Sequence, residues 1–207
     1  CKVNIQPATS YKEHIERLLN KEGDIFAVPG HYSQSLEQRG LKTIIATSYP
    51  TATYLVTSKA LYPDNLTSLS GKIIETPSKY SMSYLVIKGM LEKLNIFDSV
   101  KFNFGNSFQS STIHIIKGEV DAASIYAPAF DPLPENIKNK VNYTKIYESK
   151  NTGAILIDID APQSLIKAIQ ESKHLLRSLK WKTTETALII PIYSDLFEEQ
   201  LKEFNPQ

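Results

Sequence analysis

The sequence GKIIETPSKYSMSYLVIKGMLEKL, residues 71–94, places an apolar run, a serine-rich turn and an amphipathic run in direct succession. Residues 72–75 predict a short strand, and the apolar side chains of residues 82–94 recur at helical spacing. Ser78, Ser81 and Ser83 lie at the junction. Strand, turn and helix in this order form the repeating unit of an α/β protein. The serines raise the question of what the start of this helix binds.

The start of a helix can bind an anion, because its first N–H groups have no partner in the helix and its dipole adds a partial positive charge. Serine hydroxyls suit such a site. Serine is also a common N-cap residue. The local sequence alone therefore favours a plain cap with spare hydroxyls facing solvent, and the anion site stays open as the alternative.

The same alternation of short strands and amphipathic helices continues along the chain and predicts an α/β fold with largely parallel pairing. Predicted strands cover residues 24–28, 42–47, 53–58, 72–75, 100–104, 120–125 and 153–159. Predicted helices begin after Ser10, at His31, at Met82, after Ser110 or Ser111, at Pro162 (running to about Leu179) and at Ser194.

Composition excludes several classes of protein. The 207 residues carry 23 Lys and Arg against 22 Asp and Glu, so no basic face for nucleic acid is expected. No apolar run approaches the ~20 residues of a membrane helix. The one cysteine is Cys1, which excludes a disulfide within the chain. Cys1 fits a lipidated N-terminus, but residues 2–5 alternate like a strand instead of forming a linker, which favours a fragment boundary.

Residues for catalysis or metal binding are sparse. His14, His31, His114 and His174 are scattered and form no metal-binding spacing, so neither a metal nor a cofactor is expected. We expect His14 and His174 on the surface of helices and His114 in a structural role. His31 follows a strand and a Pro-Gly break, where sites of α/β proteins tend to lie. Neither a nucleophile elbow nor a phosphate loop occurs.

Tyrosines supply a further indication of binding. The chain has 11, several at predicted strand ends or loops: Tyr32, Tyr49, Tyr54, Tyr80 and Tyr126. Clefts often use such side chains, which combine apolar area with a hydroxyl.

Three stretches together resemble the phosphate/phosphite/phosphonate-type periplasmic solute-binding proteins of ABC transporters. They are SYKEHIERLLNKEGDIFAVPGHYSQSLEQRG (residues 10–40), YLVTSKALYPDNLTSLSGKIIETPSKYSMSYLV (54–86) and IIKGEVDAASIY (115–126). In the family, the first is similar to a helix and strand ending in a ligand loop. The second ends in the ligand-binding S-T-S-G helix start, and the third is similar to the V-x-x-G-x-V-D-A segment. The resemblance covers roughly residues 1–170.

The resemblance implies a two-lobed type II periplasmic-binding fold, a Venus flytrap with mixed, mostly parallel sheets flanked by helices. Lobe 1 would comprise residues 1–52 and 153–207, with a truncated N-terminus as one option, and lobe 2 residues 53–152. It implies an extracytoplasmic protein without catalysis, which captures a small organic or oxyanion ligand by hinge closure. Its partner would be a transporter permease or a membrane sensor.

The chain departs from the family in three places. The S-T-S-G motif falls on Tyr80, Ser81, Met82 and Ser83, and the family's ligand-binding histidine falls near Phe108. The family's first strand and helix are missing before residue 2, and the apolar run of residues 186–190 is a candidate replacement. The first two changes predict a less charged, more aromatic or organic ligand than phosphonate.

We therefore expect a monomeric solute-binding protein, periplasmic or extracellular, with a lipid anchor at the N-terminus as one option. The predicted ligand-binding residues are His31, Tyr32, Tyr54, Ser78, Tyr80, Ser81, Ser83, Phe108 and Tyr126. Three alternatives remain: a ligand-sensing domain of a signalling protein, an enzyme on the same fold with His31 as acid or base, and a ligand-free pair of lobes used for protein contact.

Overall fold

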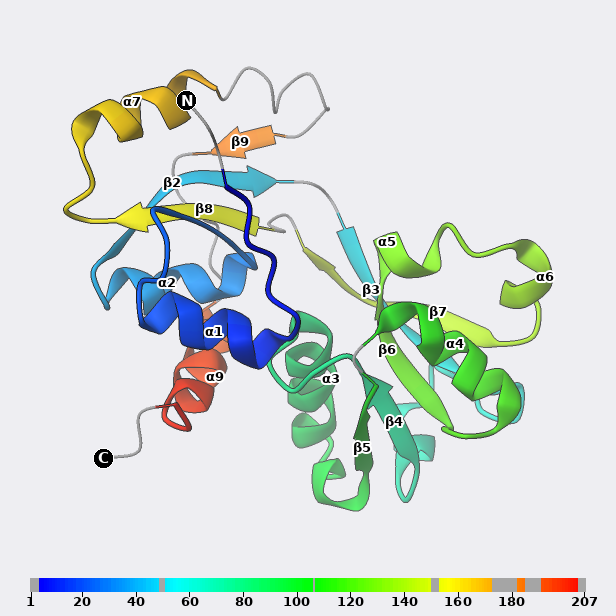
Figure 1. Cartoon of the computed structure of the whole chain (residues 1–207). Helices are drawn as coiled ribbons and strands as arrows, with labels where there is room; N and C mark the ends of the chain where they lie inside the picture. Colours follow the sequence, from blue (N-terminus) through cyan, green and yellow to red (C-terminus); the bar gives the residue numbers. More distant parts are fainter. Residues whose placement is uncertain are drawn as a thin grey trace. The chain divides into compact units, whose positions relative to one another are not determined.

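The computed structural model describes residues 4–48, 51–105, 107–149, 153–172, 182–184 and 191–204. The chain divides into two compact units, residues 1–48 with 153–207 and residues 49–152. Each unit contains one sheet with helices packed on it (Figure 1).

The first unit has a four-stranded sheet in the order β1-β8-β2-β9, in which all three pairs are antiparallel. Its strands are β1 (Ile25–Val28), β2 (Leu41–Ser48), β8 (Gly153–Asp158) and β9 (Lys182–Thr184). Its helices are α1 (Tyr11–Leu19), the 3₁₀ turn η1 (Gly30–Tyr32), α2 (Ser33–Glu37), α7 (Gln163–Glu171) and α9 (Pro191–Leu201).

Helix α1 shows how the sequence determines this unit locally. The Ser10 hydroxyl accepts a hydrogen bond from the Glu13 N–H at 3.1 Å, which caps the helix as the sequence predicts. Ile15 and Leu18, one turn apart on the helix, are buried. Burial of this apolar stripe, more than helix propensity, holds a nine-residue helix in place.

The second unit has a five-stranded sheet in the order β5-β4-β6-β3-β7. Its strands are β3 (Thr51–Thr57), β4 (Ile73–Thr76), β5 (Lys101–Phe104), β6 (Ala122–Tyr126) and β7 (Asn142–Ser149). Its helices are α3 (Met82–Lys93), α4 (Phe108–Lys117), α5 (Ala127–Phe130) and α6 (Glu135–Lys138), with 3₁₀ turns η2 (Leu66–Leu69) and η3 (Phe97–Ser99).

Helices of the second unit cover both faces of its sheet. On one face, Ile87 and Leu91 of α3 pack against Ile74 of β4. On the other, Ile115 of α4 and Phe130 of α5 share a core with the remaining face of the sheet. Strands β4, β5 and β6 run parallel and each leads into one of these helices. The starts of α3, α4 and α5 therefore gather at one edge of the sheet, where ligands bind in α/β proteins.

Several predictions about the elements need correction. Pairing is mixed but not mostly parallel, since five of the seven strand pairs in the described residues are antiparallel. Helix α4 is capped by Ser107, whose hydroxyl accepts from the Gln109 N–H at 3.2 Å, instead of by Ser110 or Ser111. Helix α9 begins at residue 191, three residues before the predicted start. Residues 173–181 and 186–190, which include His174, Leu179 and the candidate replacement strand, lie outside the described residues.

Candidate functional site

The start of α3 holds four of the predicted ligand-binding residues: Ser78, Tyr80, Ser81 and Ser83. Ser81 is the N-cap, and its hydroxyl accepts a hydrogen bond from the Tyr84 N–H at 3.2 Å. The same hydroxyl donates to the Ser78 carbonyl at 2.7 Å. Its only proton is therefore engaged within the protein, so Ser81 shapes the helix start instead of donating to a ligand.

Donors nevertheless remain at this helix start. The N–H groups of Met82 and Ser83 precede the first helical hydrogen bond, so no carbonyl of α3 accepts from them. The hydroxyl of Ser78 accepts from the Tyr80 N–H at 3.2 Å, and its proton has no acceptor among the described residues. Two amides and one hydroxyl thus lie at the positive end of a twelve-residue helix.

The neighbouring side chains define the surroundings of these donors. Tyr80 is buried, and the Lys79 ammonium lies 5.2 Å from the centre of its ring. Ser83 is buried too, and its carbonyl accepts a hydrogen bond from the Ser124 hydroxyl at 2.8 Å, which holds the first turn of α3 on strand β6. The arrangement suits an acidic or carbonyl group.

Aromatic side chains lie where β6 ends and α4 begins. Phe108 is the first residue of α4, Tyr126 is the last of β6, and their ring centres are 6.2 Å apart. Both are half-buried. The structure brings these two predicted residues together, at the edge of the sheet where α3 also begins.

Tyr54 occupies a different environment in the second unit. It lies on β3 and packs against Phe130 and Tyr143, with ring centres 5.4 and 5.8 Å away. Burial, together with the charge of Asp131 and a hydrogen bond to it, raises the pKa of the Tyr54 hydroxyl. This residue already has partners that explain its position.

His31 and Tyr32 belong to the core of the first unit. Tyr32 is 0% exposed and stacks on Phe197 of α9, with ring centres 3.9 Å apart and planes 5° apart. His31 is 6% exposed and lies edge-on against Tyr32 and Phe197. His14, expected on the surface, is half-buried near the same ring, 6.4 Å from Tyr32 between ring centres.

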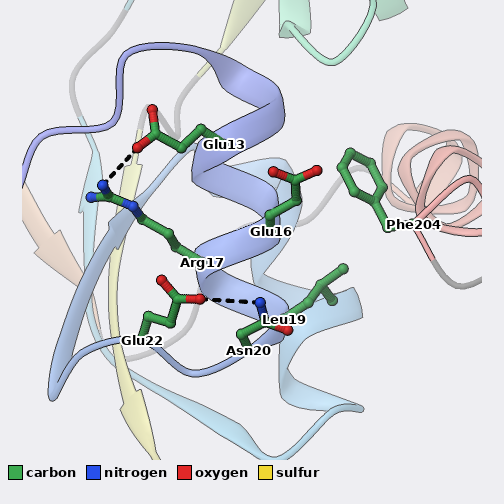
Figure 2. Close-up of a pocket in the computed structure, with 7 residues that line it drawn as sticks. All are labelled: Glu13, Glu16, Arg17, Leu19, Asn20, Glu22 and Phe204. Atoms are coloured by element: carbon green, nitrogen blue, oxygen red, sulfur yellow. Dashed lines mark hydrogen bonds and ion pairs between the residues drawn. The ribbon is translucent and has the colours of Figure 1, made fainter.

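A groove of about 510 Å³ in the first unit contains none of the predicted residues (Figure 2). Its lining comprises Glu13, Glu16, Arg17, Leu19, Asn20, Glu22 and Phe204. Arg17 is already paired with Glu13 at 2.6 Å, and Asn20 donates to Glu22 at 3.1 Å. With three glutamates and one arginine, the groove repels an acidic ligand.

The second unit has a mixed sheet, helices on both of its faces and helix starts at one sheet edge, and together with the likeness in fold to solved structures these features define the chain as an α/β protein of the type II periplasmic-binding class. Among the solved structures that are similar to this chain, three are each 12% identical to it in sequence. XAC2383 from Xanthomonas citri, bound to ATP, has a TM-score of 0.73 over 97% of this chain and 86% of its own. PhnD1 from Prochlorococcus marinus, in complex with methylphosphonate, has a TM-score of 0.71 over 100% and 87%. The periplasmic aliphatic sulphonate binding protein SsuA from Escherichia coli has a TM-score of 0.65 over 96% and 76%.

Residues 1–190 match the family described as the phosphonate periplasmic substrate-binding proteins of ABC transporters, and the chain belongs to this family. The curated proteins contain no match. The family resemblance, the two-lobed fold class and the solute-binding function predicted from the sequence are confirmed. Members of the family are periplasmic and work with a transporter. Within the described ranges, no helix is long and apolar enough to cross a membrane.

Sequence analysis missed two residues near the helix starts. Lys79 lies within the serine turn, and a cation directly before a helix start is a recognisable signal. Glu75 is the one acid in the apolar run KIIET and is completely buried. A charge in a predicted buried strand is rare enough to mark a position for closer study.

Proposed function

We propose that this chain captures a small organic molecule by its acidic group, which binds at the start of α3. The observation that supports this most directly is a set of donors there for which the described part of the chain provides no acceptor, the N–H groups of Met82 and Ser83 and the hydroxyl of Ser78. Lys79, in the same turn, has its ammonium 5.2 Å from the centre of the Tyr80 ring. Ser81 and Tyr80 hold the turn in shape, the first through its two hydrogen bonds and the second through its burial.

The remainder of the ligand lies on the aromatic side chains Phe108 and Tyr126. The ligand-binding histidine that the family has near position 108 would donate a hydrogen bond to an oxyanion, whereas the phenyl ring of Phe108 offers only apolar area. ATP and methylphosphonate, which are bound by two of the similar proteins, both carry an oxyanion, and a third similar protein binds aliphatic sulphonates. A phosphonate, sulphonate or carboxylate with an aromatic or extended apolar remainder fits both features.

The two compact units correspond, in this proposal, to the lobes predicted from the sequence, residues 1–52 with 153–207 and residues 53–152. Closure of the lobes would capture the ligand, with a transporter permease as partner, in a monomeric protein without catalysis. Attachment of a lipid to Cys1 is a further element that the family context allows. The burial of His31 against two rings disfavours its role as an acid or base in an enzyme. Tyr32, stacked in a core, is left out of the proposed site.

Isothermal titration calorimetry with four compounds tests the ligand class: phenylphosphonate, methylphosphonate, inorganic phosphate and ATP. We expect phenylphosphonate to bind at least tenfold more tightly than methylphosphonate, because its ring adds apolar contact, and inorganic phosphate to bind weakly. Micromolar affinity for phosphate or methylphosphonate, with no gain from the phenyl ring, would refute the proposed ligand class.

A further inference from the structure

A buried carboxylate lies beneath the helix starts of the second unit. Glu75, in β4, is 0% exposed, although its side chain carries a carboxyl group. The Asn103 side-chain amide of β5 donates to it at 2.7 Å. His114 Nδ1 of α4 lies 2.9 and 3.0 Å from its two oxygens. The carboxylate is therefore satisfied by side chains from two other elements.

Gly105 completes this arrangement from the connection between β5 and α4. A Cβ atom at this position would lie 2.7 Å from the Glu75 carboxyl carbon, so only glycine allows the backbone to approach so closely. The Gly105 N–H donates to the Thr76 carbonyl at 3.0 Å. The connection that leads to α4 thus packs closely on the Glu75 carboxyl group and is hydrogen-bonded to Thr76 at the end of β4.

The contacts of Glu75 join the two connections that lead to the proposed ligand site. Thr76 follows Glu75 and ends β4, directly before the serine turn that starts α3. Gly105 and His114 belong to the connection and the helix that present Phe108. One side chain therefore ties the approach to α3 to the approach to α4.

Stability alone does not explain a carboxylate at this place. A buried charge is costly to desolvate, and apolar residues of similar volume often replace buried ion pairs without loss of stability. A carboxylate does, however, fix directions, since it accepts from donors at defined angles and distances. The selection of such a group is better explained by the geometry that it imposes on its partners.

We infer that Glu75, through Asn103, Gly105 and His114, is a positioning residue that sets the start of α4 relative to the start of α3 and thereby determines ligand affinity. This inference rests on the proposed function and deepens it, since it names residues that do not touch the ligand. His114 contributes by its Nδ1–H bond to the carboxylate, a bond that the neutral and the protonated ring can both form.

The experiment compares His114→Leu with His114→Asn in the full chain. Asparagine places an amide N–H near the position of Nδ1, whereas leucine retains volume without a donor. Two readouts are needed: amide hydrogen exchange at Gly105 and Gln109, and affinity for phenylphosphonate. We expect His114→Leu to speed exchange at both amides at least tenfold and to weaken binding at least fivefold, and His114→Asn to restore both to within twofold of the wild type.

A matched control is Ile87→Val, which trims a buried side chain of the same unit on the opposite face of the sheet. It should lower the melting temperature without changing exchange at Gly105 or the affinity. The inference is overturned if exchange at Gly105 and Gln109 is unchanged in His114→Leu, or if His114→Leu binds phenylphosphonate like the wild type. If the wild type itself does not bind phenylphosphonate, the proposed ligand class fails, and the exchange measurement still decides whether the pair positions α4.

Discussion

Replacing Ser81 by aspartate separates the capping role of this residue from the charge of the site. The Ser81 hydroxyl caps α3 by accepting from the Tyr84 N–H. Aspartate and asparagine both cap helices about as well as serine. Both variants keep an oxygen that can accept from the Tyr84 N–H. They differ by one negative charge beside the N–H groups of Met82 and Ser83, and by the hydrogen bond to the Ser78 carbonyl, which the asparagine amide can donate and the aspartate carboxylate cannot.

The magnitude follows from Coulomb's law. Two like charges about 4–6 Å apart near a protein surface repel each other by roughly 3–4 kcal/mol. Since each 1.4 kcal/mol is about tenfold in affinity, Ser81→Asp should bind phenylphosphonate roughly 100- to 700-fold more weakly than Ser81→Asn. Ser81→Asn should stay within about threefold of the wild type, because the protein already engages the Ser81 proton and the ligand does not need it.

Calorimetry measures the affinities at two salt concentrations, and urea unfolding checks that both variants remain folded. The penalty of Ser81→Asp should shrink as salt screens the repulsion. Ser81→Ala, which removes the cap, should lower the stability of the second unit by about 1 kcal/mol. Equal affinity of Ser81→Asp and Ser81→Asn for phenylphosphonate would refute the placement of an acidic group at this helix start.

Three further predictions concern other parts of the molecule. Phe197→Ala removes the ring stacked on Tyr32 and should lower the unfolding free energy of the first unit by about 3–5 kcal/mol in urea. The pKa of His14 is lowered, chiefly by burial and then by the charge of Arg17, so protonation favours the unfolded chain. Stability should therefore fall as the pH drops below the ordinary histidine value of about 6.5, and His14→Gln should reduce this fall in pH-dependent melting curves. Gly105→Ala drives a Cβ into the Glu75 carboxyl group and should lower the unfolding free energy of the second unit by about 1–3 kcal/mol. In a chain that already carries Glu75→Ala, Gly105→Ala should cost much less, because the carboxyl group that the new Cβ meets is gone.

Each of these predictions has its own control. Phe197→Ala should leave phenylphosphonate affinity unchanged if Tyr32 does not touch the ligand, and a large loss of affinity in a folded variant would return Tyr32 to the site. If the melting temperature of His14→Gln falls with decreasing pH as steeply as that of the wild type, protonation of the buried His14 ring is not what destabilises the protein. If the losses of unfolding free energy caused by Gly105→Ala and Glu75→Ala simply add in the double variant, the predicted contact between the two residues is contradicted.

Much of the fold could be predicted because its signals are local. The strand at residues 72–75 and the helix from Met82 were found from apolar spacing and a serine cap, and the structure has both elements within one residue. Strand direction could not be found in this way. Alternation of apolar residues identifies the buried face of a strand, but it is the same whether the neighbouring strand is parallel or antiparallel.

The candidate site was only partly predictable, since its decisive contacts join distant residues. Glu75 lies 28 residues from Asn103 and 39 from His114, and no local pattern links them. The burial of Tyr32 depends on Phe197, near the other end of the chain, and Arg39 pairs with Glu198 across 159 residues. The sequence places Tyr32 in a loop after a strand, which describes a ligand contact and a core residue equally well.

The serine turn illustrates the limit of local reasoning. From the sequence, Ser78, Ser81 and Ser83 were equivalent hydroxyls at a helix start. In the structure they differ: Ser81 is engaged as a cap, Ser83 is buried against β6, and Ser78 retains a proton to donate. The cap and the anion site are therefore not alternatives, since the cap at Ser81 leaves the first two amides of α3 available.

The most direct test of the central claim is an NMR titration of the ¹⁵N-labelled protein with phenylphosphonate. The account predicts that the largest saturable shifts occur at the amides of Met82, Ser83 and Phe108, the starts of α3 and α4. Shifts centred on the groove beside Glu16 and Phe204, or no saturable shift at millimolar ligand, would contradict the claim that the start of α3 binds the acidic group of the solute.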